Sequence, residues 1–255
     1  LQKVLASPGA PPAGSPPHLC NPEAFHLPAD CQDQTHLTKT HRKLIAIASK
    51  FKVDITGEWN DFDAAWHQVL RAWDSSFGTK KAWERLSKYK LEWIYKYRDA
   101  IKAASSQYGV PAWVVAGIAF NEVGKVSPTV EITAANVRKI FHGTKEGIGR
   151  FLDTSLGSMN IQIDTAAQML GYNLENLTSD QVRSIIKSIK NPVEAIFIAT
   201  SYVAYLEKRY INGRRIPLGP VDWGNIASKY NGSGPSAVEY GRWVVRNRST
   251  FEKIM

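Results

Sequence analysis

The chain has 255 residues, of which 44% are hydrophobic and 22% charged. This is the composition of an ordinary globular protein with one large domain, or a domain with an extension, and no apolar run reaches the roughly 20 residues of a transmembrane helix. The formal net charge of +9 favours polyanionic partners such as nucleic acid, anionic lipid or an acidic cell-wall polymer.

The N-terminal region, residues 1–37, combines a linker with a cysteine-containing loop. Its proline- and glycine-rich stretch at 7–17, SPGAPPAGSPP, is typical of a linker and indicates an upstream domain of a longer chain. Cys20 and Cys31 are candidates for a disulfide in an oxidising compartment. Free thiols, or a metal site with nearby histidines such as His41, are alternatives, but the spacing matches no familiar zinc motif and we predict no metal.

Helical periodicity begins near Thr38 and defines an N-terminal helical region at 38–106. Three stretches carry apolar residues at helical spacing, namely 41–51, 61–73 and 80–108. Aromatic residues at this spacing are more typical of a core than of a binding surface, so we expect them to be buried.

The next stretch, YGVPAWVVAGIAFNEVG at 108–124, predicts a buried core helix. Gly109 can end the preceding helix, and Pro111 suits the first position of a new one. The run that follows is almost wholly apolar, as in a helix that is buried on all sides. Glu122 continues the apolar stripe at helical spacing, so it should face the core.

Glu122 is therefore the first catalytic candidate. Burial raises the pKa of a carboxylic acid in general, and an acid that keeps its proton near neutral pH can act as a general acid. The alternative is a glutamate at a helix end whose side chain simply reaches water or a helix cap.

The rest of the chain is also predicted to be helical. Residues 124–156 are rich in turn residues, contain Glu131 and have the length of a loop that could form a substrate cleft. Helices are expected near 134–141, 165–170, 179–188, 192–210, 222–230 and 236–253. No segment has a convincing strand period, so we predict an all-α fold.

Four segments, in this order, resemble motifs of lytic transglycosylases and goose-type lysozymes. They are NEVG at 121–124, SLGSMNIQID at 155–164, NPVEAI…YVAYL at 191–206 and ASKYNGSG at 227–234. The second resembles an S-x-G-x-M-Q-I pattern and the last an A-x-Y-N-x-G pattern. The sequence departs from the family in having Asn-Ile between Met159 and Gln162, and Val123 where transglycosylases carry Ser.

The resemblance implies a lysozyme-like catalytic domain at 107–255 that cleaves peptidoglycan between N-acetylmuramic acid and N-acetylglucosamine. It implies that Glu122 is the general acid and that no cofactor takes part. The residues that it implies for substrate binding are Ser155, Gly157, Met159, Gln162, Tyr230 and Asn231. Without the resemblance, Tyr230 and Asn231 would be an ordinary helix end and Met159 a core residue.

A second carboxylate separates hydrolysis from transglycosylation. An inverting hydrolase needs one to activate water, at roughly 6.5–9.5 Å from the acid, whereas a lytic transglycosylase uses the muramoyl 6-hydroxyl and leaves an anhydro product. By resemblance to goose-type lysozymes, Asp153 is the first candidate and Asp164 the second; Glu131 is a further competitor. As alternatives, Asp153 would be a turn or cap residue and Asp164 a helix start.

The resulting hypothesis is a muramidase, secreted or delivered to the bacterial periplasm or cell wall, such as an antibacterial effector or a phage lysin. Peptidoglycan is the expected partner, and an effector would also have an immunity protein that plugs its cleft. The alternatives are a lytic transglycosylase, a non-catalytic glycan-binding module and a nucleic-acid-binding domain. We do not expect nucleic acid as a partner because the basic residues form no recognition motif.

Overall fold

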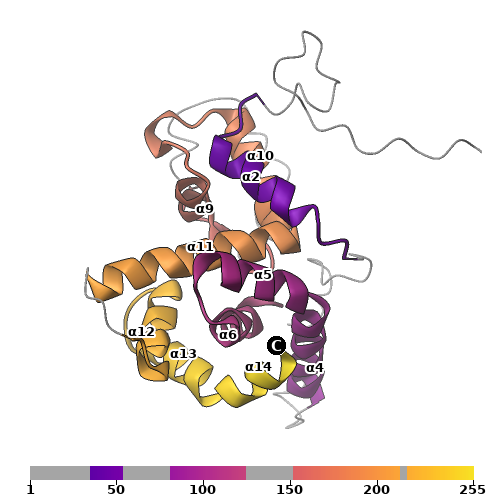
Figure 1. The fold of residues 1–255 in the computed structure, drawn as a ribbon, viewed down its shortest axis with the longest axis vertical. Coiled ribbons are helices and arrows are strands. Elements are labelled where there is room, and N and C mark those ends of the chain that lie inside the picture. The colour runs from indigo at the N-terminus through magenta and orange to yellow at the C-terminus, as the bar shows by residue number, and fades with distance from the viewer. Residues whose placement is uncertain (1–34, 54–80, 125–151, 213–216) are drawn as a thin grey trace, which may run out of the picture. The chain divides into compact units, whose positions relative to one another are not determined.

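The computed structural model describes residues 35–53, 81–124, 152–212 and 217–255. The described part is predominantly helical, which confirms the prediction of an all-α protein, and Leu37–Met255 form one compact unit (Figure 1). Several predicted features lie outside the described residues: the linker at 7–17, Cys20, Cys31, Glu131 and the helices expected at 61–73 and 134–141.

The helices before the chain reaches Glu122 are α2 (Lys39–Ala48), α4 (Lys81–Lys96), α5 (Arg98–Tyr108) and α6 (Ala112–Glu122). A two-stranded antiparallel hairpin follows, with β1 (Ser155–Leu156) paired to β2 (Ile161–Gln162). The later helices are α9 (Ile163–Met169), the 3-10 helix η2 (Leu174–Asn176), α10 (Ser179–Lys190), α11 (Pro192–Ile211), α12 (Pro220–Tyr230), α13 (Pro235–Arg246) and α14 (Arg248–Ile254).

Local sequence explains several helix ends. Gly109 ends α5 in the left-handed conformation, with φ of 74°, and Pro111 is the residue before the first turn of α6. The side chain of Asn191 caps α11 by accepting hydrogen bonds from the backbone N–H groups of Val193 and Glu194. The predicted start of α11 at Pro192 is confirmed, whereas Pro111, expected in the first position of the next helix, is instead the N-cap of α6.

Two predicted helices are each divided in two. The helix expected at 80–108 bends at Tyr97, between α4 and α5, and the one expected at 236–253 bends at Asn247, between α13 and α14. Each of these residues has a ψ near zero, 10° and 8° respectively, which turns the chain. Tyr97 is fully buried and keeps the helical period, so the sequence carried no sign of the bend.

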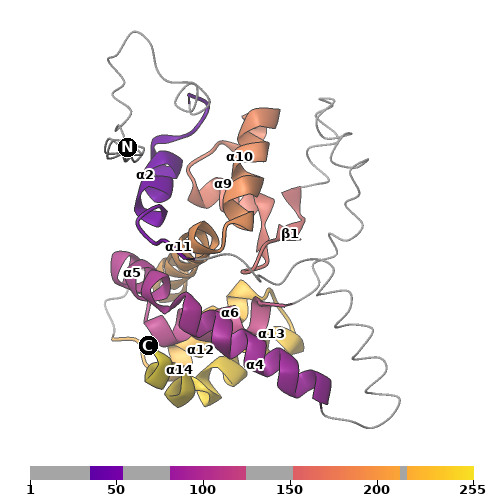
Figure 2. The same ribbon diagram turned by 90° about the vertical axis from the view of Figure 1, so that its right-hand side faces the viewer.

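The hairpin was not predicted, because strands of two residues are too short to show a period of two. Its connection contains two residues with positive φ, Gly157 at 71° and Asn160 at 50°. A Cβ at Gly157 would lie 2.0 Å from the backbone oxygen of Ile189, so the hairpin packs directly on the end of α10. Figure 2 shows β1 beside α10.

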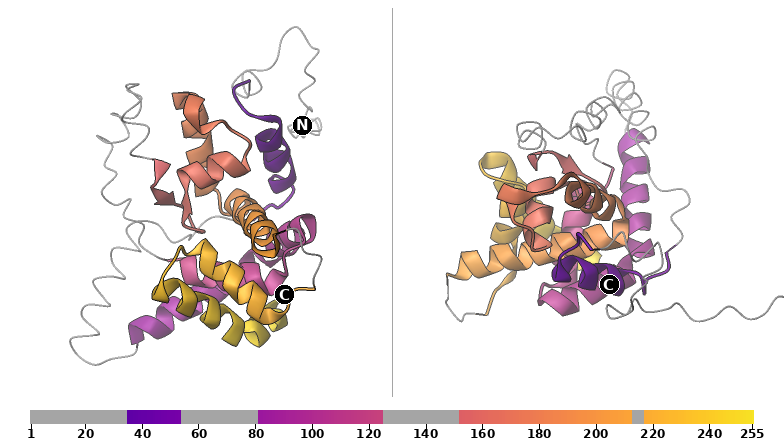
Figure 3. Two further views of the ribbon diagram at one scale, coloured as in Figure 1. Left: turned by 90° about the vertical axis from the view of Figure 1, so that its left-hand side faces the viewer. Right: turned by 90° about the horizontal axis from the view of Figure 1, so that it is seen from above.

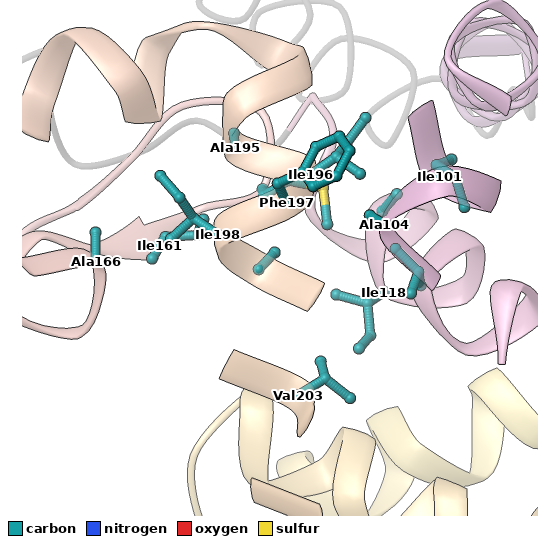
Figure 4. Packing of buried hydrophobic residues seen from close by; sticks show 14 of the residues in the cluster. Ile101, Ala104, Ile118, Ile161, Ala166, Ala195, Ile196, Phe197, Ile198 and Val203 are labelled. Atoms are coloured by element: carbon teal, nitrogen blue, oxygen red, sulfur yellow. The ribbon is translucent and has the colours of Figure 1, made fainter. Parts of the chain in front are cut away.

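The core is built around α6 and α11. Helix α11 packs against α2, α5, α9, α10 and α12, and α6 packs against α4, α5, α13 and α14. Figure 4 shows their side chains meeting, with Ile118 of α6, Ile101 of α5 and Ile196 of α11 among those labelled. All three are fully buried. The helices on both sides of residue 107 therefore share one core.

Helices α12 and α13 pack closely side by side (Figures 1 and 3). At their contact, a Cβ on Gly241 would lie 2.1 Å from the backbone oxygen of Gly224, so the two backbones touch. This close pairing fixes Tyr230 at the end of α12 relative to Tyr240 within α13. None of the described helices is both long enough and apolar enough to cross a membrane.

Candidate active site

Glu122 is the last residue of α6, and only 3% of it is exposed. Its neighbours along the helix, Ile118 and Ala119, are fully buried. The prediction that Glu122 faces the core is therefore confirmed. The alternative, a helix-end glutamate whose side chain simply reaches water, does not fit this burial.

A cavity of about 190 Å³ opens beside Glu122. Helix α6 contributes the carboxylate, and the hairpin, α9, α11 and α12 contribute further lining residues. The lining residues are Glu122, Ser155, Asn160, Ile161, Gln162, Thr165, Tyr202, Lys229, Tyr230, Asn231 and Gly232. Nearly all carry polar groups, so the cavity suits a hydrophilic ligand such as a saccharide.

Four of the six residues implied for substrate binding line this cavity together with Glu122: Ser155, Gln162, Tyr230 and Asn231. The other two do not line it. The Met159 side chain is fully buried in the core, and Gly157 packs against α10. Met159 nevertheless takes part through its backbone oxygen, which accepts a hydrogen bond from the Tyr230 hydroxyl at 2.8 Å.

Asn160 is a site residue that the sequence comparison missed. Its Nδ2 donates a hydrogen bond to Oε2 of Glu122 at 3.1 Å. Gln162, which had been matched to the amide of the family pattern, instead donates to the backbone oxygen of Asp153 at 3.3 Å. The spacing could have identified Asn160, because it directly follows Met159, just as Gln directly follows Met in the pattern S-x-G-x-M-Q-I.

Two tyrosines complete the surroundings of Glu122. Burial raises the pKa of the Tyr230 hydroxyl well above its ordinary value, and the Glu122 carboxylate and Tyr202 raise it further. Burial likewise raises the pKa of Tyr240, helped by the Glu122 carboxylate, by Tyr230 and by a hydrogen bond to Glu122. Both hydroxyls stay protonated at neutral pH, so they can donate hydrogen bonds. Tyr240 was not predicted, since no motif singles it out.

The second carboxylate is not found among the described residues that line the cavity. Asp153 is exposed in the turn before β1, outside the lining. Asp164 accepts a hydrogen bond from the backbone N–H of Thr165 in the first turn of α9. The pKa of Tyr202 is raised by burial and, to a smaller extent, by the charge of Asp164. Glu131 lies outside the described residues. In the described lining, Glu122 is thus the one carboxylate.

Over the described ranges, no group of three or more His, Cys, Asp or Glu side chains could hold a metal ion. Among the described residues that line the cavity, the ionisable side chains are those of Glu122, Lys229, Tyr202 and Tyr230. Comparison with protein-family models, curated proteins and solved structures finds no match for this chain.

Proposed function

We propose that the protein cleaves the glycan strands of peptidoglycan, with Glu122 as the general acid. The observation that carries the proposal is a buried glutamate that ends an apolar helix and faces a polar cavity. All four segments that resemble the lytic transglycosylase and goose-type lysozyme motifs contribute residues to that cavity, although they are far apart in the sequence.

The chemistry follows from the poor leaving group. When the bond between N-acetylmuramic acid and N-acetylglucosamine breaks, the departing sugar oxygen needs a proton, and Glu122 supplies it. Glu122 then becomes a carboxylate in a buried place, where a negative charge needs hydrogen-bond donors. Asn160 and Tyr240 are such donors. They would also orient the carboxyl group toward the cavity.

Two candidate functions fit this proposal, and they differ in the nucleophile that attacks the glycosidic bond. A hydrolytic muramidase requires Asp153, or a carboxylate outside the described residues, to activate water. The absence of a second carboxylate from the described lining favours a lytic transglycosylase, in which the muramoyl 6-hydroxyl attacks and no second carboxylate is needed. Asp153→Asn separates the two, because it should impair a hydrolase severely and leave a transglycosylase nearly unchanged.

The direct test of the proposal is release of soluble fragments from dye-labelled peptidoglycan. We expect Glu122→Gln to lower the rate by about 10²- to 10⁴-fold, because the amide keeps the shape but has no proton to give. Glu175→Gln is the matched control, since Glu175 is an exposed glutamate of η2 and should leave the rate unchanged. Robust cleavage by a folded Glu122→Gln protein would contradict the proposal.

The basic charge of the chain supports action at an acidic cell wall, where it would hold the protein on its substrate. We extend the proposal to secretion or delivery to the periplasm or wall. If the protein is an antibacterial effector, its immunity partner would plug the cavity next to Glu122. A non-catalytic glycan-binding module is the alternative, and it would bind peptidoglycan without releasing soluble fragments from it.

A further inference from the structure

A row of aromatic rings leads out of the cavity along α11. Tyr202 lines the cavity, and its ring lies 5.7 Å from that of Tyr230, measured between centroids. Tyr202 also stacks on Tyr205 at a centroid distance of 6.2 Å, with the ring planes only 20° apart. Both α11 rings are partly exposed. The row is therefore continuous with the proposed active site.

Arg209 ends this row. It lies one helical turn after Tyr205, on the same side of α11. Its Nη1 donates a hydrogen bond to the Tyr205 hydroxyl at 2.9 Å, and its guanidinium lies 5.6 Å from the centre of the Tyr205 ring. The side chain is exposed, and no acidic group in the described part of the chain forms an ion pair with it.

We propose that Tyr202, Tyr205 and Arg209 form a binding track for the substrate strand beyond the cavity. The two tyrosines would pack against a sugar ring, and Arg209 would bind a carboxylate of the peptide attached to that strand. This inference rests on the proposed function, because it assumes that a glycan strand occupies the cavity. We call these three residues the α11 track.

The chemistry of the track matches that ligand. Ring faces are suited to the apolar faces of sugars, while a guanidinium binds a carboxylate through paired N–H groups. The contact with Tyr205 holds Arg209 in place before the ligand arrives, which lowers the entropy that binding must offset. An uncharged glycan would contact the tyrosines but offer no carboxylate to Arg209, so the track suits a strand that carries acidic peptides.

Affinity, measured apart from cleavage, tests the track. All proteins carry Glu122→Gln, and co-sedimentation with purified peptidoglycan gives the Kd. We expect Tyr205→Ala and Arg209→Gln each to weaken binding by about three- to tenfold, and Tyr205→Phe to lose less than Tyr205→Ala because it keeps the stacked ring. Arg42→Gln, which removes an exposed charge from α2, is the control and should bind like the parent.

A second substrate separates the two parts of the track. On glycan strands treated to block the peptide carboxylates, Arg209→Gln should bind as the parent does, while Tyr205→Ala should still be weaker. The proposal of an α11 track would be overturned if both variants bound intact peptidoglycan as tightly as the parent. It would also be overturned if the parent did not bind intact peptidoglycan. Cleavage by the protein with Glu122 intact is measured separately, so failure of the proposed function is distinguished from failure of the track.

Discussion

Asn160 shows how a single residue links backbone conformation to the proposed chemistry. Its φ of 50° is uncommon for a side chain other than glycine, although asparagine tolerates it better than most residues. This conformation lies in the connection between β1 and β2, next to Met159, whose backbone oxygen accepts a hydrogen bond from Tyr230. The result is an amide hydrogen-bonded to the Glu122 carboxylate.

We therefore predict that Asn160→Gly lowers the rate of glycan cleavage by about ten- to a hundredfold, the effect of removing a hydrogen bond to a charged group. Glycine accepts the positive φ, so the free energy of unfolding should change little. Steady-state rates and urea denaturation of the same protein check both parts. A rate equal to that of the wild type would remove Asn160 from the site.

At the residue scale, site residues could be predicted from the sequence where neighbouring residues of the same element determine their position. Glu122 could be predicted because its burial follows from helical spacing within α6. Asn160 could not be chosen over Gln162 by residue type alone, since the pattern calls for Gln and only the spacing points to Asn160. Tyr240 carries no local signal, because its approach to Glu122 depends on how closely α13 packs against α12.

At the scale of elements, a close backbone contact with α10 supports the hairpin that carries Asn160. Gly157 and Gly109 have nearly the same φ, 71° and 74° respectively. A Cβ on Gly157 would meet the backbone of Ile189, whereas a Cβ on Gly109 would have nothing within 4 Å. The two glycines therefore form a pair that is matched in φ and differs in packing.

We predict that Gly109→Ala costs about 1–2 kcal/mol of stability, the cost of the left-handed conformation. Gly157→Ala should cost about 1–3 kcal/mol more, because overpacking adds to the same strain, and it should also slow cleavage by moving the hairpin. Chemical denaturation gives both free energies of unfolding. Equal costs would mean that the hairpin yields freely and does not support the site.

Helix α2 is attached to the later helices by a buried chain of hydrogen bonds. The His41 ring lies within 2.6 Å of the Tyr172 hydroxyl at Nδ1 and within 2.7 Å of Ser188 Oγ at Nε2. Burial raises the pKa of Tyr172 to about 12, and a hydrogen bond from the Thr38 backbone offsets part of this rise. Each ring nitrogen of His41 therefore lies within hydrogen-bonding distance of one hydroxyl group. These two contacts occupy both ring nitrogens of His41, so it is not free for the metal site considered as an alternative.

We predict that His41→Phe lowers the free energy of unfolding by about 2–4 kcal/mol, because it leaves two buried hydroxyl groups without this partner. Ser188→Ala should cost less, and adding it to His41→Phe should cost little more, since the two residues act as one unit. Urea denaturation of the single and double variants checks this. Additive losses would contradict the coupling.

Periodicity predicted the helices of this protein better than their bends. Helices α10 and α11 were predicted nearly to their ends, because their apolar stripes and caps are strong. The bends at Tyr97 and Asn247 were missed, since neither interrupts the apolar spacing. The helices on both sides of each bend pack against α6, a tertiary contact that the sequence does not show.

At the scale of the whole molecule, the helices before residue 107 belong to the same core as the proposed catalytic part. Trp93, Ile94, Tyr97 and Ile101 of the α4–α5 segment are buried in the cluster that includes α6 and α11. Removing them would expose much of that apolar surface to water.

We therefore predict that a protein reduced to residues 107–255 shows no cooperative thermal unfolding, whereas one reduced to Leu37–Met255 unfolds cooperatively, as the compact unit should. Circular dichroism during heating distinguishes the two. A cooperative transition in the shorter protein would show that the region at 38–106 is dispensable for folding.

The central claim is that Glu122 donates a proton to a glycosidic oxygen of peptidoglycan, and mass spectrometry of the digestion products tests it most directly. Purified peptidoglycan is incubated with the wild type and, in parallel, with Glu122→Gln. The account predicts muropeptides with newly formed muramic ends from the wild type and none from the variant. Anhydro ends, lighter by one water, would identify a lytic transglycosylase. Reducing ends would identify a hydrolase, and they would assign water activation to Asp153 or to a carboxylate outside the described residues. New muramic ends in equal amount from both proteins, or from neither, would contradict the claim.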